Sequence, residues 1–292
     1  MDVAGVAAGD ASARCRSIER PSPGPPIFAG KSTSAQPPAT PTNLHRGCPG
    51  KPQASAQVKS AILLAGLNAR GTTIVEEAKP TRDHTERMLR GFGAVVDVRR
   101  QGEGVRVSLE GGQSLSAIEA AIPGDPSSAA FLVAAGMISP EGDVMVEGVM
   151  SNPTRSGFYD VANLMGAALG AEEAGDAAGE RLINVHAGAA GLVGKAVPEK
   201  LVPSMIDEFP ILAVLAAFAE GETVVTGAEE LRVKESDRIG AVVAMLRANG
   251  VEAEERPDGF AVQGCGGPPP GGGLVEARHD HRIAMSALIM GT

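Results

Sequence analysis

The pentapeptide Gly221-Glu-Thr-Val-Val225 decides the fold, because it occurs twice more, in altered form, earlier in the chain. The earlier copies are Gly71-Thr-Thr-Ile-Val75 and Gly142-Asp-Val-Met-Val146. Each copy follows an apolar helical segment, and a glycine turn before β-branched or apolar residues predicts a strand. A helix and a strand that recur along a chain indicate a structural repeat. The sequence therefore predicts an α/β (α+β) fold built from repeated units.

Each repeat continues in the same way after its strand. A basic stretch comes first, at Thr81-Arg82-Asp83, Thr154-Arg155-Ser156 and Lys234-Glu235-Ser236. A second helix follows, and it is expected to close on a glycine at Gly93, Gly170 or Gly250. Two short strands end the unit, with hairpins expected at Val105–Leu109 and around Asp258-Gly259. Because the charged residues recur at the same end of each unit, a purely structural repeat protein is disfavoured.

The first 54 residues differ from the rest of the chain. They hold nine of the 21 prolines and show no sustained helical or strand periodicity, which is typical of disorder. Ordered pattern begins at Ser55, so residues 1–54 are interpreted as a disordered or non-native segment. A fourth unit starts at Asp280. Its helix is expected to expose four apolar residues, Ile283, Met285, Leu288 and Ile289.

Composition argues against several classes of function. The chain of 292 residues has a net charge of −9 and 3% aromatic residues, with no Trp. General binding of nucleic acids or anionic membranes is therefore disfavoured. No apolar run reaches the roughly 18 residues of a membrane helix, and no signal peptide is recognised at the N-terminus. The three cysteines have neither metal-ligand spacing nor the pattern of a disulfide framework, so a reducing cytoplasm is expected.

The stretch Leu231-Arg-Val-Lys-Glu-Ser-Asp-Arg238 is the clearest sign of chemistry. It lies directly before a segment with helical periodicity. Ser236 is the expected cap of that helix, with Lys234 and Glu235 just outside it and Arg238 in its first turn. A helix N-terminus with added cations favours a phosphate or carboxylate ligand. The plain alternative is a solvated charged turn.

The first helix of each unit also begins with polar residues. They are Ser55-Ala56-Gln57, Asp125-Pro-Ser-Ser128, Ser204-Met-Ile-Asp-Glu208 and Asp280-His-Arg282. Capping explains Ser and Asp at these places, but Arg282 is a poor cap, which favours a ligand-binding role. Asp207 and Glu235 are the candidate acid and base. The alternative is a surface acid and half of a local ion pair, because a free Glu, with a pKa of about 4.3, holds a proton at neutral pH only near bound anions.

The histidines give little support for a metal site. His279-Asp280-His281 supplies too few ligands, so no metal is expected. His84 begins a helix in which Asp83 and Glu86 have the spacing of a capping box, which predicts a surface role for the imidazole. Cys265 is interpreted as a loop thiol.

Six segments together resemble the enolpyruvyl transferase family. They are Ser55–Ser60, Thr81–Thr85, Gly124–Ser128, Ser204–Glu208, Leu231–Arg238 and His279–Met285, and their order and spacing agree with the family over residues 55–292. The resemblance implies two domains, each of three βαβαββ-type units, with helix N-termini facing a common cleft. It places a domain crossover near Gly124. Residues 55–124 would then be the last unit of one domain, and residues 125–292 two units and the start of a third in the other.

Within the family, the segments match the members that act on shikimate 3-phosphate. These transfer the enolpyruvyl group of phosphoenolpyruvate to the 5-hydroxyl of shikimate 3-phosphate and release phosphate. The resemblance implies that Asp207 takes the hydroxyl proton and that Glu235 donates a proton to the methylene carbon. It assigns shikimate 3-phosphate to Ser55, Ala56, Gln57, Arg82, Asp207 and Lys234, and phosphoenolpyruvate to Gln57, Lys234, Arg238 and Arg282. It implies no cofactor, no metal, no nucleic-acid or membrane partner, and a monomer.

The sequence also departs from the family. The family's N-terminal Lys-Ser…Arg motif, which contacts both substrates, has no counterpart in residues 1–54, and the strands expected after residue 292 are missing. The chain is therefore expected to be truncated at both ends and, alone, inactive or nearly so. Two alternatives are a non-catalytic anion-binding fragment and the family members that act on UDP-N-acetylglucosamine. The latter carry a reactive loop cysteine, and Cys265 lies in the wrong unit for it.

Overall fold

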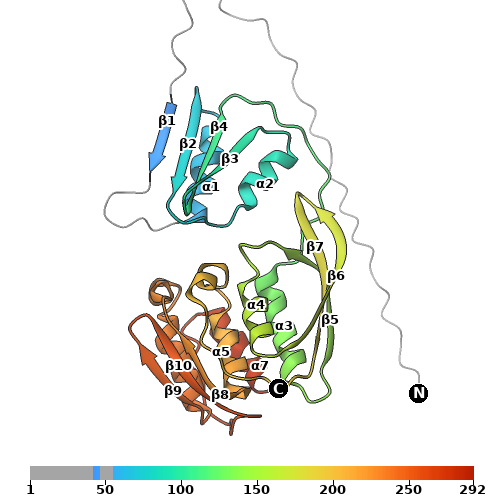
Figure 1. Ribbon diagram of the computed structural model, residues 1–292, viewed down its shortest axis with the longest axis vertical. Helices are drawn as coiled ribbons and strands as arrows, with labels where there is room; N and C mark the ends of the chain where they lie inside the picture. Colours follow the sequence, from blue (N-terminus) through green and yellow to red (C-terminus); the bar gives the residue numbers. More distant parts are fainter. Residues whose placement is uncertain (1–41, 47–54) are drawn as a thin grey trace, which may run out of the picture. The chain divides into compact units, whose positions relative to one another are not determined.

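The computed structural model describes residues 42–46 and 55–292 (Figure 1). The predictions of disorder and of non-native sequence for residues 1–54 lie outside the described residues, except at strand β1 (Thr42–Arg46). This strand runs parallel to β2 (Thr72–Glu77), with Thr42 opposite Thr72. Strand β1 was not predicted from the sequence.

The predicted repeat is confirmed, because three successive parts of the described region 55–265 have the same order of elements. Each runs helix, strand, helix, strand, strand, as follows: α1 (Ala56–Gly66), β2, α2 (His84–Gly91), β3 (Val96–Gln101) and β4 (Gly104–Glu110); α3 (Pro126–Ile138), β5 (Asp143–Ser151), α4 (Gly157–Leu164), β6 (Ala168–Ala177) and β7 (Glu180–Gly188); α5 (Phe209–Phe218), β8 (Glu220–Val225), α6 (Arg238–Ala248), β9 (Glu252–Arg256) and β10 (Gly259–Cys265). Two short 3-10 helices accompany the third part: η1 (Glu199–Ser204) lies between β7 and α5, and η2 (Glu229–Val233) lies between β8 and α6.

Strand order shows the same repetition. The three sheets of the described region run β1-β2-β4-β3, β5-β7-β6 and β8-β10-β9. In each unit the last strand therefore lies between the other two and pairs antiparallel with both. Cys265 ends β10 rather than lying in a loop, so the loop interpretation of this thiol was wrong.

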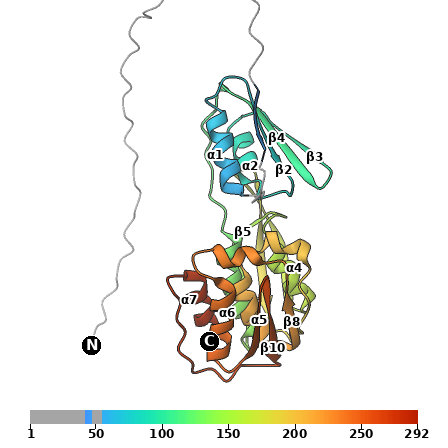
Figure 2. The same cartoon turned by 90° about the vertical axis from the view of Figure 1, so that its left-hand side faces the viewer.

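The first unit has a small core of its own. Figure 2 shows α1 and α2 on one face of the sheet, where Leu63 and Leu89 pack over Val107 and Leu109. All four side chains are almost fully buried. Each such side chain contributes about 1.5–3 kcal/mol relative to an exposed one, so the sheet and its two helices are held together mainly by these contacts.

The second and third units share a larger core, with α5 at its centre. Nine of the ten residues of α5 are buried, including Phe209, Ile211 and Leu215. A helix that is apolar on every side needs packing partners all round. The partners of α5 are α3, α4, α6, α7 (His281–Met290) and β10.

Helix α7 is better covered than the sequence predicted. Ile283 is fully buried and Met285 and Ile289 are partly buried, because α7 packs on α5, α3 and α6. Of the four residues expected to be exposed, Leu288 alone is largely exposed in this described helix, at 72%. The prediction of an uncovered apolar helix was wrong, since the neighbouring helices cover it without further strands.

Helix caps were predicted with mixed success. Ser55 and Asp125 cap α1 and α3, as expected, by accepting hydrogen bonds from the amides of Val58 and Ser128. In α6, however, the cap is Asp237, which accepts from the amide of Gly240. The prediction of Ser236 as the cap was wrong, because Asp and Ser suit this position equally well and the sequence offers both side by side.

Two further local predictions were wrong. The second unit's helix α4 closes at Gly166, which has φ +91°, and Gly170 lies within β6. In α2 the expected capping box is absent from the described contacts, because Glu86 is buried and pairs with Lys59 at 2.8 Å. Among the described residues, no helix is long and apolar enough to cross a membrane.

Candidate active site

Three arginines from separate segments meet at Asp207, which lies just before α5. Arg82, from the connection between β2 and α2, donates to Oδ2 of Asp207 at 2.7 Å. Arg238, the first residue of α6, lies 3.3 Å from Oδ1. Arg282, in the first turn of α7, donates to the backbone carbonyl of Asp207 at 3.2 Å, and its other Nη lies 3.9 Å from Oδ2. The carboxylate is therefore surrounded by cations held at the start of helices.

These cations keep Asp207 ionised. Burial by itself would raise the pKa of this carboxyl, but the hydrogen bond from Arg82 and the charges of Arg282, Arg82 and Lys234 outweigh burial. The pKa of Asp207 is thereby lowered to about 2. A group with this pKa is a charged but weak base until something weakens the pull of its arginines.

Arg238 is the anchor of the cluster. Its guanidinium has no exposed surface and pairs with Asp280, which is also fully buried, at 2.8 Å. Asp280 in turn caps α7 through the amide of Arg282 and accepts from Ser236. A buried ion pair of this kind is costly to break, because either partner alone would be an uncompensated buried charge. The pair thus fixes the starts of α6 and α7 beside each other.

Glu235 completes the contacts of Arg238. Its carboxylate lies 2.5 Å from Nη2 of Arg238, and its side chain is 52% exposed. The other candidate cations remain reachable from solvent, with side-chain exposures of 28% for Arg82, 23% for Lys234 and 16% for Arg282. Lys234 pairs with Glu230 one turn earlier. A ligand can therefore approach Arg82, Lys234 and Arg282 directly, whereas the guanidinium of Arg238 is enclosed by Asp207, Glu235 and Asp280.

The structure does not join Ser55, Ala56 and Gln57 to this cluster. Ser55 caps α1, Ala56 begins the helix, and Gln57 is exposed. Among residues 55–292, no hydrogen bond or ion pair connects these three to Asp207 or its arginines. The neighbouring Lys59 has a structural role, because it is buried and pairs with Glu77 at 3.0 Å as well as with Glu86.

Some residues near the site were missed by the sequence analysis. Glu208, next to Asp207, is 2% exposed, and neither of its carboxylate oxygens has a hydrogen-bond partner among the described residues. Burial raises the pKa of Glu208, and Ser127 and Arg155 offset this only in part. Its acidic neighbour in the sequence could have drawn attention to it, but nothing in the pattern indicated burial. Asp280 was expected to cap its helix, and it does cap α7, but its pairing with Arg238 was missed because it depends on contacts between helices distant in the sequence.

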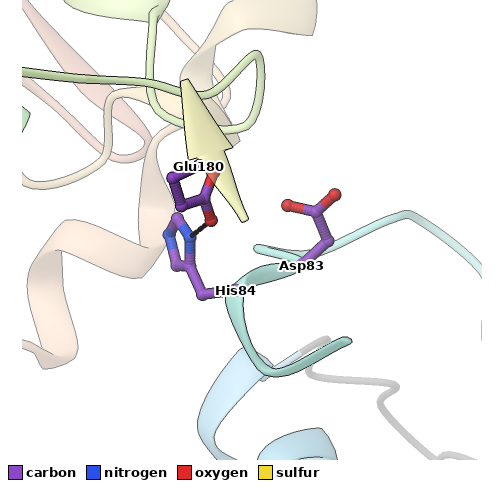
Figure 3. A group of neighbouring side chains, drawn as sticks. All are labelled: Asp83, His84 and Glu180. Carbon is purple, nitrogen blue, oxygen red and sulfur yellow. Dashed lines mark hydrogen bonds and ion pairs between the residues drawn. The ribbon is translucent and has the colours of Figure 1, made fainter. Parts of the chain in front are cut away.

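A second polar cluster begins at Asp83, the residue that follows Arg82. Asp83, His84 and Glu180 form the group in the described region whose atoms are close enough to hold a metal ion (Figure 3). Their oxygens are already engaged, however, by the amide of Asn152 and the guanidinium of Arg87. A metal ion would have to displace both donors, so the donor set fits a hydrogen-bonded ionic cluster better than a metal centre.

Comparisons with known proteins show the family to which the chain belongs. Residues 51–292 match the family model described as EPSP synthase (3-phosphoshikimate 1-carboxyvinyltransferase). A 3-phosphoshikimate 1-carboxyvinyltransferase of Hyphomonas neptunium is 77% identical over 82% of this chain and 55% of its own length. The corresponding protein of Maricaulis maris is 52% identical, with 82% of this chain and 54% of that protein covered. The chain thus spans about half the length of the curated relatives it matches.

Solved structures show the same relation. An EPSP synthase structure from Acinetobacter baumannii matches with a TM-score of 0.76 and 45% identity, over 85% of this chain and 55% of that one. At 19% identity and a TM-score of 0.54, the enolpyruvyl transferase NikO from Streptomyces tendae shares the fold. The repeated units therefore have the enolpyruvyl transferase fold. With 242 of its residues matched by the family model, the chain belongs to the EPSP synthase family.

Proposed function

We propose that this chain contributes to the transfer of the enolpyruvyl group from phosphoenolpyruvate to the 5-hydroxyl of shikimate 3-phosphate, with release of phosphate. The observation that supports this most is the meeting of Arg82, Arg238 and Arg282 at Asp207. Two phosphorylated reactants need several cations at one place, and guanidinium groups bind phosphate and carboxylate oxygens in pairs. Helix N-termini at the same place add to the attraction.

Charge balance suggests how the reactants would activate Asp207. Three carboxylates, Asp207, Glu235 and Asp280, balance the three arginines of the cluster as described. A bound phosphate would draw Arg82 or Arg282 away from Asp207 and bring negative charge close to it. Both effects raise the pKa of Asp207. The carboxylate then becomes a better base for the 5-hydroxyl proton when the reactants are in place.

Glu235 is proposed as the proton donor. In the reaction, a proton adds to the methylene carbon of phosphoenolpyruvate and the hydroxyl oxygen adds to C2. The tetrahedral intermediate then loses phosphate together with a proton from the new methyl group, which restores the carbon–carbon double bond. Glu235 contacts Arg238, and this contact must break before the carboxyl group can reach the methylene carbon. We therefore assign the carboxylate of phosphoenolpyruvate to Arg238 and Arg282, so that binding releases Glu235 toward the reacting carbon.

The remaining assignments are part of the same proposal. Arg82 and Lys234 would bind shikimate 3-phosphate, and Ser55, Ala56 and Gln57 would reach it from the start of α1, with Gln57 also contacting phosphoenolpyruvate. Residues 55–124 and 125–292 would belong to different domains. A monomer is proposed from the resemblance to the family, and a location in the cytoplasm from the low cysteine content.

Ligand-induced stabilisation and turnover test the proposal together. Shikimate 3-phosphate at 100 times its dissociation constant should stabilise the protein by about 2.7 kcal/mol, whereas shikimate without its phosphate should do so much less. Phosphate release is then measured with both reactants. Equal stabilisation by inorganic phosphate and by shikimate 3-phosphate would favour the non-catalytic anion-binding alternative. Absence of any stabilisation would reject the proposal.

A further inference from the structure

We propose that Asn152 and Glu180 are positioning residues that hold Arg82 at the substrate site. The inference rests on the proposed function, because it concerns the binding of shikimate 3-phosphate by Arg82. Neither residue would touch the substrate, since Asn152 is 1% exposed and Glu180 is 5% exposed. Both would act through the two residues that follow Arg82.

Three consecutive residues reach side chains far away in the sequence. Arg82 contacts Asp207 at 2.7 Å. Asp83 accepts a hydrogen bond from the amide of Asn152, also at 2.7 Å. Nδ1 of His84 lies 2.7 Å from Glu180. The contacts of Asp83 and His84 thus fix the backbone on the C-terminal side of Arg82. The guanidinium of Arg82 therefore reaches Asp207 from a backbone position that does not move.

Asn152 and Glu180 form one unit. The amide nitrogen of Asn152 lies 3.1 Å and 3.3 Å from the two carboxylate oxygens of Glu180, and it also donates a hydrogen bond to Asp83. Arg87 provides the balancing positive charge, at 2.9 Å from Asp83 and 3.6 Å from Glu180. Buried polar groups that are all hydrogen-bonded fix a single arrangement, and loss of one partner leaves the others unsatisfied.

The backbone of the β6–β7 hairpin explains how Glu180 comes to this place. Its turn residues Ala178 and Gly179 have φ values of +52° and +81°, and Glu180 follows as the first residue of β7. Figure 3 shows the carboxylate of Glu180 pointing to the imidazole of His84, with Asp83 beside it. A Cβ on Gly179 would lie 3.2 Å from the carbonyl oxygen of Arg87. The hairpin tip is therefore packed directly against α2.

A fixed backbone position matters for Arg82 because its side chain is long and partly exposed, at 28%. Immobilising such a side chain costs conformational entropy. With the Asp83 and His84 contacts in place, this cost is limited to the side chain. Without them the connection between β2 and α2 must be ordered as well when the substrate binds. Removal of the anchors should therefore weaken shikimate 3-phosphate binding through Arg82.

A double-mutant cycle on the affinity for shikimate 3-phosphate tests this. The four proteins are the wild type, Glu180→Gln, Arg82→Ala and the double variant, titrated by calorimetry. We expect Glu180→Gln to weaken binding about 3- to 10-fold in the wild type and less than about 2-fold in the Arg82→Ala background. A merely structural role would weaken binding equally in both backgrounds, and that result would overturn the proposal. So would an unchanged affinity in Glu180→Gln.

Two further variants keep the test decisive. Glu173→Gln removes an exposed carboxylate from the same hairpin, whose partner is Arg181, and should leave the affinity unchanged. If Glu180→Gln does not fold, His84→Ala replaces it in the cycle, because Glu180 then keeps Asn152 and Arg87 as partners. Failure of the wild type to bind shikimate 3-phosphate would reject the proposed function and this inference with it. Binding by the wild type with additive effects in the cycle would reject the inference alone.

Discussion

Glu235 lies 2.5 Å from Arg238 and is the most exposed of the three described carboxylates that contact this buried guanidinium. In the proposed site, a carboxylate or phosphate that binds Arg238 would have to replace Glu235, and this competition would lower the affinity of the ligand.

Removing this competitor should tighten anion binding. We predict that Glu235→Ala binds phosphoenolpyruvate about 3- to 10-fold more tightly, because a like charge is removed from the site and Arg238 is uncovered. Calorimetric titration of phosphoenolpyruvate into the wild type and the variant measures the effect. Weaker binding by Glu235→Ala would show that Glu235 does not compete with the ligand.

Arg238 should be far more important for stability than an exposed arginine. Arg238→Met leaves Asp280 buried without its partner and is expected to cost about 3–5 kcal/mol of unfolding free energy. Arg181→Met breaks an ion pair whose side chains are 60% and 80% exposed, and should change stability by no more than about 0.5 kcal/mol. Urea denaturation compares them. Similar losses for the two variants would mean that Asp280 does not depend on Arg238.

Asp207 should make stability fall at low pH. Its pKa is lowered from 3.8 to about 2 in the folded protein, so the unfolded chain binds more protons in this range. The contribution of about 2 kcal/mol is present above pH 4 and is lost as the pH falls toward 2. Asp207→Asn should lack this contribution. The difference in unfolding free energy between wild type and variant should therefore be largest above pH 4, fall as the pH drops through 2, and be smallest below pH 2. A difference that does not depend on pH would contradict the account.

Glu208 should have the opposite effect. Because burial raises the pKa of this carboxyl, the folded protein binds its proton more strongly than the unfolded chain does. Glu208 thus lowers stability as the pH rises above the unfolded value of 4.5. We predict that Glu208→Gln, which resembles the protonated form, raises the melting temperature at neutral pH by at least about 2 °C. The gain should disappear below pH 4, and a loss of stability at pH 7 would show that the charged carboxylate has a partner.

Much of the fold could be predicted from the sequence, because its signals are local. Strand β8 was predicted with little error from the glycine turn at Gly221 and the strand residues up to Val225. Helix α6 was predicted as well from the spacing of its apolar residues. Competing local signals caused the misplacements, as with Ser236 and Asp237 for one cap and with Gly166 and Gly170 for one helix end.

The site was predictable only in part. Charged residues beside helix starts indicated Asp207 and its arginines, because helix termini and cations act together over short distances in the sequence. Burial of Asp280 and Glu208 was not predictable, since it depends on how α5, α6 and α7 pack. The Asn152–Glu180 pair was missed for a similar reason. The two residues come together with Asp83 and His84 only because the β6–β7 hairpin packs against α2.

Direct titration of shikimate 3-phosphate into the wild type, Arg82→Ala and Arg181→Ala tests the central claim most directly. We predict saturable binding of one molecule per chain, weakened at least about 10-fold by Arg82→Ala, because a charge-assisted contact contributes about 1.5–3 kcal/mol, and unchanged by Arg181→Ala. The account would be contradicted if the wild type showed no saturable binding, or if the two arginine variants bound as well as each other.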